Sequence, residues 1–195
     1  MKQQIIIIRG GDSFKTHKAY IAFLKAFRID IKRYASGKKE WKEKLGKIMG
    51  KNYEVVIPEM PNRMNARYGE WKMWFEKFVP HMRSGVLLVG HSLGGLFLVK
   101  YLSENTFPKK IRAVFLIAAP AGEGNFPAPK NIKKLEQQGG EIFLYHSIDD
   151  SVVPFRDFER YCKKLKEARI RTFSNRQHFN QEQFPELVRD IRGIV

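Results

Sequence analysis

Short runs of apolar residues alternate along the chain with longer segments in which apolar residues recur every three or four positions. Three of the short runs, Ile5–Ile8, Val86–Val89 and Ala113–Ala118, are apolar throughout, which is typical of strands covered on both faces. The complete set of predicted strands is Ile5–Ile8, Val55–Ile57, Val86–Val89, Ala113–Ala118, Ile142–Tyr145 and Ile170–Phe173.

The longer segments predict amphipathic helices. Over residues 65–79, for example, Tyr68, Trp71, Phe75 and Phe78 form one apolar stripe. The other predicted helices cover 92–104, 155–166 and 184–194, together with 14–28 and 41–49, which form an insertion of about residues 14–50 after the first strand. Alternating strands and helices predict an α/β fold with a mostly parallel sheet, in one domain over 1–195. Residues 119–141 are rich in Gly and Pro and predict a surface loop.

Composition narrows the class of protein. The chain has 195 residues, of which 43% are hydrophobic and 13% aromatic, and this excludes intrinsic disorder. The single cysteine, Cys162, excludes an internal disulfide. No apolar run is long enough for a signal peptide or a membrane span, so we expect a cytoplasmic protein without membrane insertion.

The formal net charge of +16 permits an anionic partner. Basic residues concentrate in residues 32–51, where they are Lys32, Arg33, Lys38, Lys39, Lys42, Lys44, Lys47 and Lys51. Within this stretch Trp41, Leu45 and Ile48 have helical spacing, which predicts a packed helix with its lysines in water. No zinc-ligand spacing, phosphate-binding loop or RNA-binding aromatic pattern accompanies it, so we do not expect a nucleic acid partner. A non-catalytic binding protein with an anionic partner is the alternative hypothesis.

One segment points to specific chemistry. The run from Gly90 to Gly94, Gly-His-Ser-Leu-Gly, follows a predicted buried strand and precedes a predicted helix, which is the context of a nucleophile elbow. Glycines two positions before and after Ser92 permit a tight turn that pushes its side chain outward. The helix N-terminus beneath it offers N–H groups, that of Leu93 first, where an oxyanion would develop.

A nucleophilic serine needs a base, and the base needs an acid that orients it. In an elbow of this kind the chain order is Ser, then Asp or Glu, then His. His178 follows the last predicted strand, and Asp150 follows the strand before it, with Asp149 as a weaker candidate that suits a turn or cap. Because parallel strands align their carboxyl ends, these loops and Ser92 are expected at one edge of the sheet.

The remaining histidines have structural interpretations. His17 and His81 lie in predicted helices, His91 is a hydrogen-bonded packing group beneath the serine, and His146 precedes the acid in chain order. His17 is the second candidate base, because it follows the loop after the first strand.

That loop contains Gly10 and Gly11, and paired glycines let a backbone approach a ligand closely. We predict that Gly11 or its neighbour Gly10 supplies a second oxyanion N–H beside that of Leu93. A simple tight turn is the alternative.

With these residues placed, the chain resembles small α/β-hydrolases of the retinoblastoma-binding-protein-type serine hydrolase family, which has bacterial carboxylesterase-like relatives. The matching residues are 58–62 (Pro-Glu-Met-Pro-Asn), Ala66, Trp71, 90–94, 147–154 (Ser-Ile-Asp-Asp-Ser-Val-Val-Pro), 178–180 (His-Phe-Asn), Phe184, Glu186 and Leu187. The resemblance implies an α/β-hydrolase-type three-layer sandwich with strand order 2-1-3-4-5-6 and a minimal cap. It also implies a catalytic triad of Ser92, Asp150 and His178, with no metal and no cofactor.

Three features depart from the family pattern. Arg9 stands where many hydrolases carry a histidine, and Gln177 stands where a glycine is usual, so we expect the loop of His178 to take a different backbone path. The insertion over 14–38 is long for the family, and we expect it to shape or partly cover the site.

The expected reaction is two-step acyl transfer on a small-molecule ester, with amide or aminoacyl substrates as alternatives. The short 119–141 loop leaves no room for a large cap, so we expect an open site. Candidate substrate-binding residues are Asn62, within 62–64, together with Phe126 and Phe155. The oligomeric state does not follow from the sequence.

Overall fold

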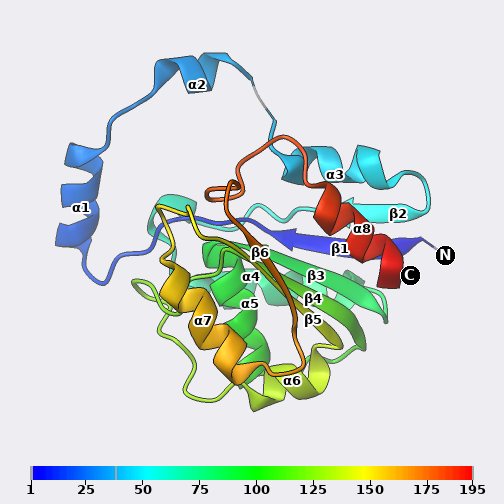
Figure 1. Ribbon diagram of the computed structural model, residues 1–195. Helices are drawn as coiled ribbons and strands as arrows, with labels where there is room; N and C mark the ends of the chain where they lie inside the picture. The colour runs from blue at the N-terminus through cyan, green and yellow to red at the C-terminus, as the bar shows by residue number, and fades with distance from the viewer. Residues whose placement is uncertain (1, 38, 195) are drawn as a thin grey trace.

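The computed structural model describes residues 2–37 and 39–194, so Met1, Lys38 and Val195 lie outside the described residues. Its centre is a six-stranded sheet in the order β2-β1-β3-β4-β5-β6, with every neighbouring pair parallel (Figure 1). The strands are β1 (Gln3–Ile8), β2 (Tyr53–Val56), β3 (Val86–His91), β4 (Ile111–Ile117), β5 (Glu141–Ser147) and β6 (Arg169–Phe173). The predicted fold class and strand order are therefore confirmed.

Helices connect the strands, and all of the predicted helices are present. The complete set of helices in the described residues is α1 (His17–Ala26), α2 (Ile31–Ala35), α3 (Trp41–Met49), η1 (Arg63–Asn65), α4 (Tyr68–Phe78), η2 (Val79–His81), α5 (Leu93–Glu104), α6 (Lys133–Gln138), α7 (Phe155–Lys164) and α8 (Pro185–Ile194). Helices α2 and α6 were not predicted, because five and six residues are too few to show a helical period. Helix α6 corrects the expectation that residues 119–141 contain only loop.

The sheet is covered on both faces because the side chains of its strands alternate between two apolar layers. In β1, Ile6 and Ile8 belong to one layer, which also contains the buried sides of α4, α5 and α7. Ile5 and Ile7 belong to the other layer, with the buried sides of α3 and α8. Figure 1 shows these two groups of helices on opposite sides of the strands, which is a three-layer sandwich.

The inserted segment between β1 and β2 has two very different parts. Helix α1 contains no buried residue, and Figure 1 shows α1 and α2 standing apart from the sheet. Helix α3 packs on the sheet through Trp41, Leu45 and Met49.

The packed face of α3 differs from the predicted one. Ile48 is exposed, whereas Lys42, predicted to lie in water, is only 4% exposed. The helix is rotated so that Trp41, Leu45 and Met49, spaced four apart, face the sheet. This rotation also turns Lys42 inward.

Within residues 2–37 and 39–194, no helix has both the length and the apolar character needed to cross a membrane.

Candidate active site

Ser92 lies where the chain turns from β3 into α5. Its backbone has φ 55° and ψ −127°, a positive φ that a residue with a side chain seldom adopts. The Ser92 N–H donates to the carbonyl oxygen of Ile117 on β4 at 2.9 Å, so the neighbouring strand holds the turn. Ser92 is 8% exposed.

The glycines around Ser92 are required by close backbone contacts. A Cβ at Gly90 would lie 2.6 Å from the Cα of Gly95, and a Cβ at Gly94 would lie 2.1 Å from the carbonyl oxygen of Ile8. Carbon atoms do not approach so closely, so a side chain at either position would force α5 away from β1 or β3. The predicted need for glycine at both positions is confirmed.

Loops after three different strands bring Ser92, His178 and Asp150 together. The Nε2 atom of His178 lies 2.9 Å from the Oγ of Ser92, and its Nδ1 lies 2.9 Å from Oδ2 of Asp150. The sheet explains this convergence, because the carboxyl ends of β3, β5 and β6 lie along one edge. Such a chain of hydrogen bonds can move the hydroxyl proton to the imidazole while the carboxylate holds the imidazole in the required tautomer.

The surroundings of Asp150 keep its carboxylate ionised. Burial raises the pKa of Asp150, but hydrogen bonds from His178 and from the N–H groups of Val153 and Val152 together lower it below its ordinary value. The side chain of Asp150 is fully buried and that of His178 is 12% exposed. A buried anion beside His178 therefore persists at neutral pH.

Asp149, the weaker candidate for the acid, supports the histidine loop instead. Its Oδ1 accepts a hydrogen bond from the Ser147 hydroxyl and another from the Gln177 N–H at 3.0 Å. The Ser147 hydroxyl also accepts from the Arg176 N–H at 3.0 Å. The hydrogen bond from Ser147 lowers the pKa of Asp149. The two adjacent aspartates thus hold the same loop. Asp149 binds the backbone N–H of Gln177, and Asp150 binds the ring of His178.

The loop after β1 approaches Ser92 closely. A Cβ at Gly10 would lie 2.8 Å from Cβ of Ser92, and a Cβ at Gly11 would lie 2.4 Å from the carbonyl oxygen of Arg63. Among the hydrogen bonds between described residues, none uses the N–H of Leu93 or Gly11. Both groups are therefore available to an oxygen atom bound at this edge of the sheet.

Two arginines hold this loop. Arg63 donates from Nε to the carbonyl oxygen of Gly10 at 2.9 Å, and its own carbonyl accepts from the Asp12 N–H at 2.8 Å. Arg9 pairs with Glu43 of α3 at 3.1 Å, so it ties the end of β1 to the inserted segment. Neither role was predicted from the sequence, in which Arg9 is a departure from the family pattern and Arg63 is one of residues 62–64.

The structure excludes one of the three candidate substrate-binding residues from the wall of an open site, and the other two stay predictions. Phe126 is fully buried and packs edge-to-face on Tyr68 and Trp71, so its placement on the wall of an open site was wrong. Asn62 is exposed and its side chain donates to Glu70 at 2.9 Å. Phe155 is partly buried against the core and contacts the ring of His146.

Among the hydrogen bonds of the described residues, none joins another histidine ring to the Ser92 hydroxyl. His17 lies on α1, where its ring contacts that of Tyr20. His146 hydrogen-bonds the carbonyl oxygen of Val153 at 3.0 Å, and His91 is buried beneath the serine. Within the described part of the chain, no group of three His, Cys, Asp or Glu side chains could hold a metal ion.

The backbone of the histidine loop is strained on both sides of His178. Gln177 has φ 47° and Phe179 has φ 54°, both in the left-handed region. Gln177 therefore adopts a conformation that glycine favours, and the chain accepts strain at this position.

Comparisons with known proteins agree with this fold and identify the family. Residues 33–186 match the model of the serine hydrolase family. The serine hydrolase RBBP9 of Rattus norvegicus is 22% identical over 152 residues, which cover 73% of this chain and 78% of that protein.

Solved structures show the same fold. The ydeN gene product from B. subtilis superposes with a TM-score of 0.73 at 16% identity, covering 99% of this chain and 98% of that one. The esterase PE8 superposes with a TM-score of 0.60 at 17% identity, covering 100% of this chain and 93% of that one. Since the family match spans most of the sequence and the chain has the corresponding α/β-hydrolase fold, the protein belongs to the serine hydrolase family.

Proposed function

We propose that the protein hydrolyses small acyl esters through an acyl-enzyme formed on Ser92, with His178 as general base and acid and Asp150 as its orienting carboxylate. The observation that carries the proposal is the pair of 2.9 Å contacts that join Ser92 Oγ, His178 and Asp150. The strained elbow supports it, because residues held at a positive φ despite the steric cost cluster at active sites.

In the first half-reaction His178 Nε2 takes the proton of Ser92 as Oγ attacks the ester carbonyl carbon. The tetrahedral oxyanion accepts hydrogen bonds from the N–H of Leu93 and from that of Gly11 or Gly10. Asp150 stabilises the imidazolium that has formed. The carbon–oxygen bond of the ester then breaks, and the leaving alcohol takes the proton from His178.

In the second half-reaction water attacks the acyl group on Ser92. His178 takes the proton of the water and returns a proton to Oγ, which releases the carboxylic acid and restores the enzyme. Every proton in this cycle passes through one nitrogen, Nε2, because Nδ1 stays bonded to Asp150.

Small esters are the proposed substrates because only the short helix α6 interrupts the loop between β4 and β5, where a cap would otherwise stand. The structural neighbour called esterase PE8 supports the same substrate class. Amide and aminoacyl substrates share the mechanism and are the alternatives within it.

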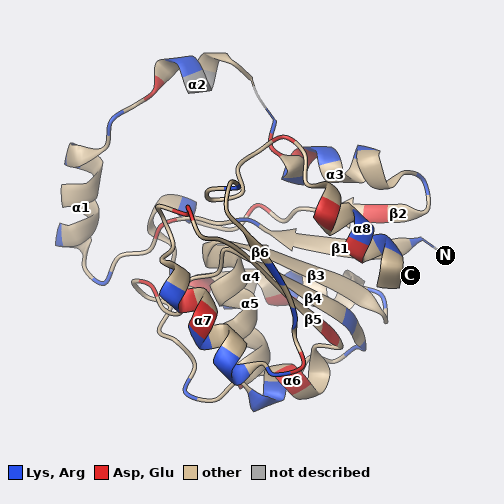
Figure 2. Cartoon of the chain, in the orientation of Figure 1, with Lys and Arg blue, Asp and Glu red and all other residues tan. Residues whose placement is uncertain are grey.

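A separate feature favours a second, binding function. A hollow of about 1070 Å³ at the amino ends of the strands is lined by five cations, Lys2, Arg83, Lys109, Lys110 and Arg112, and by no acid. Figure 2 shows Lys and Arg in blue at this end of the sheet beside the N-terminus. The hollow includes no triad residue, so an anionic partner could bind there without blocking hydrolysis.

A Lys110→Gln/Arg112→Gln variant should weaken oligonucleotide binding at low salt and leave esterase activity unchanged.

Intact-mass labelling with a fluorophosphonate tests the proposed hydrolase directly. We expect one adduct on the wild-type protein, none on Ser92→Ala, and slow labelling of His178→Gln, because that variant keeps the nucleophile and loses its base. Panels of p-nitrophenyl esters and aminoacyl amides then separate the substrate classes. A folded wild-type protein that takes no adduct would contradict the mechanism and favour the binding function.

A further inference from the structure

Lys42 is a buried cation directly beneath the candidate active site. It is 4% exposed, and its Nζ lies 3.1 Å from Nδ1 of His91 and 2.5 Å from a carboxylate oxygen of Glu40. Lysines are almost never buried without a specific partner. Burial lowers the pKa of Lys42 below its ordinary value, and the Glu40 carboxylate, which pairs with the ammonium form, partly opposes this shift. The triad mechanism makes no use of this group.

The contacts of His91 fix the direction of its hydrogen bonds. An ammonium group can only donate, so Nδ1 of His91 must accept from Lys42. Burial lowers the pKa of His91 well below its usual range, and the nearby Lys42 and His178 lower it further, so the ring is neutral and carries one proton. That proton is on Nε2, which lies 2.8 Å from the carbonyl oxygen of His178 and donates to it.

The carbonyl that receives this hydrogen bond belongs to a backbone segment that needs support. Gln177 and Phe179, on either side of His178, have positive φ, and each such residue is strained by about 1 kcal/mol or more. Helix α3 supplies two further contacts to the same loop. Trp41 donates from Nε1 to the carbonyl oxygen of Phe179 at 2.8 Å and from its backbone N–H to that of Gln181 at 2.9 Å.

We propose that Lys42 and His91 are positioning residues for the base of the hydrolase reaction. Lys42 selects the Nε2–H tautomer of His91, and His91 then holds the His178 carbonyl so that the imidazole stays 2.9 Å from Ser92 Oγ. The inference rests on the proposed function for its effect on catalysis, whereas the tautomer of His91 is a property of the fold alone.

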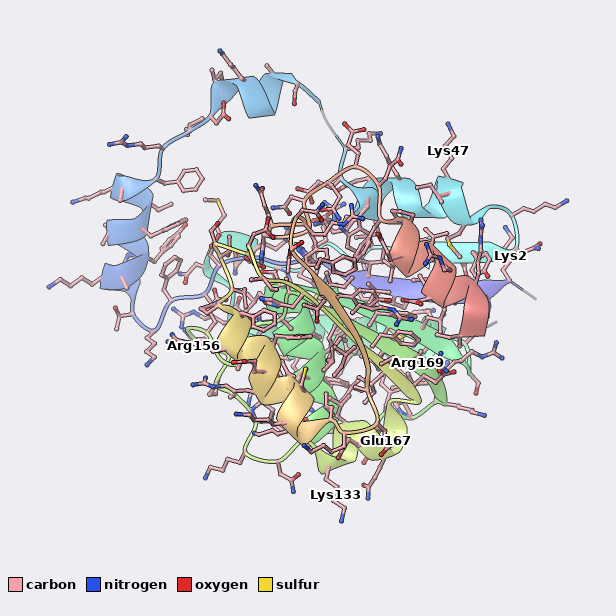
Figure 3. The ribbon with its side chains drawn as sticks, in the orientation of Figure 1. Lys2, Lys47, Lys133, Arg156, Glu167 and Arg169 are labelled. Carbon is pink, nitrogen blue, oxygen red and sulfur yellow. The ribbon has the colours of Figure 1, made fainter. Side chains whose placement is uncertain are left out.

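The kinetic test compares Lys42→Met with Lys47→Met on p-nitrophenyl acetate. Methionine fills similar volume but cannot donate, and Lys47 lies on the same helix with its side chain directed away from the molecule (Figure 3). Because small misplacement of a reacting group slows chemistry, we expect kcat to fall about 10- to 100-fold in Lys42→Met with KM within about twofold. Lys47→Met should match the wild-type protein. Equal kcat in the two variants would overturn the proposal.

Variants of His91 separate positioning from simple support of the fold. His91→Gln keeps an N–H near the place of Nε2 and should retain most of kcat, whereas His91→Leu should lose as much as Lys42→Met. In the double variant Lys42→Met/His91→Gln the amide needs no lysine to orient it, so kcat should recover. A double variant as slow as Lys42→Met alone would show that Lys42 acts only through packing, and would overturn the proposal.

Histidine ¹⁵N–¹H spectra of the wild-type protein provide a readout that does not depend on activity. We expect His91 in the Nε2–H tautomer, with a loss of this preference in Lys42→Met. A wild-type Nδ1–H tautomer would overturn the proposal even if Lys42→Met were slow or failed to fold. Absence of both turnover and fluorophosphonate labelling, with the Nε2–H tautomer present, would instead contradict the proposed function.

Discussion

The two parts of the inserted segment contain similar side chains but lie in opposite environments. Helix α1 has Tyr20 and Phe23, whose rings contact Phe14, yet none of its residues is buried. Helix α3 begins with Trp41, which is 1% exposed and packs edge-to-face on Phe184.

The difference shows that an apolar pattern predicts a helix but not whether the helix has a partner. Helix α3 is fixed because it contacts both loops of the site, through Arg9–Glu43 on one side and Trp41–Phe179 on the other. The anchored part of the insertion, helix α3, thus supports the candidate active site, whereas the outer part, helices α1 and α2, does not.

The largest expected effect comes from removing the anchor. Trp41→Ala deletes a buried indole and leaves the carbonyl oxygen of Phe179 without its donor, so we expect the free energy of unfolding to fall by about 3–5 kcal/mol. Phe23→Ala is the matched control on α1, and it should cost less than about 1 kcal/mol. Urea denaturation measures both, and equal losses would remove the distinction between the two helices.

A smaller effect is expected at the base of the outer part, where Glu123 accepts from the Ser13 N–H at 3.2 Å. Burial and, to a smaller extent, the neighbouring Asp12 raise the pKa of Glu123 from 4.5 to about 7, although the hydrogen bond from the Ser13 N–H opposes this rise. The folded protein therefore holds a proton that the unfolded chain has lost between about pH 4.5 and 7, and stability falls as pH rises through this window.

Glu123→Gln removes this titration while keeping an oxygen that can accept from Ser13. We expect the variant and the wild-type protein to have equal free energies of unfolding below about pH 4.5. Above pH 7 the variant should be more stable by about 1–2 kcal/mol, which is less than the full shift in pKa would give because Glu123 is partly open to solvent. Thermal or urea unfolding across pH 4–8 gives the comparison. A difference that does not depend on pH would contradict it.

The strain that α3 helps to hold can be measured at Gln177. Because glycine adopts φ 47° without steric penalty, Gln177→Gly should relieve strain and stabilise the protein by up to about 1 kcal/mol, offset in part by its greater freedom when unfolded. The same change at Gln137, an exposed residue within α6, is the control and should destabilise. Loss of stability at Gln177 would mean that the loop is not strained there.

The smallest effect is expected when the outer part is removed. Replacing residues 17–30 by a flexible Gly–Ser linker should change the free energy of unfolding by about 0.5 kcal/mol or less, because α1 buries nothing against the body. A loss comparable with that of Trp41→Ala would show that α1 packs on the body in solution.

Much of the fold and the site could be predicted from the sequence because their patterns are local. The central strands are short apolar runs, and the glycines at 90 and 94 are dictated by contacts within one turn and its adjacent strand. The convergence of Ser92, Asp150 and His178 then follows from the way parallel strands end at one edge.

The rest depends on partners that are distant in sequence. Phe126 lies in a segment with the composition of a surface loop, but it packs on Tyr68 and Trp71 from another helix. The sequence pattern predicts that Lys42 is solvated, and only the rotation of α3 in the structure shows that it is buried. No local pattern indicates that Gln177 would accept a glycine conformation, because the surrounding contacts impose it.

The bond from Trp41 to Phe179 joins residues 138 positions apart, and all six strands precede His178 in the chain. A ribosome making this protein therefore completes Ser92 and Asp150 while the indole of Trp41 still has no acceptor at Phe179. Long-range contacts of this kind form late and leave apolar surface exposed until they do. The hydrogen-bonded chain of Ser92, His178 and Asp150 is consequently completed only near the end of synthesis, together with the segment that carries the acceptor for Trp41.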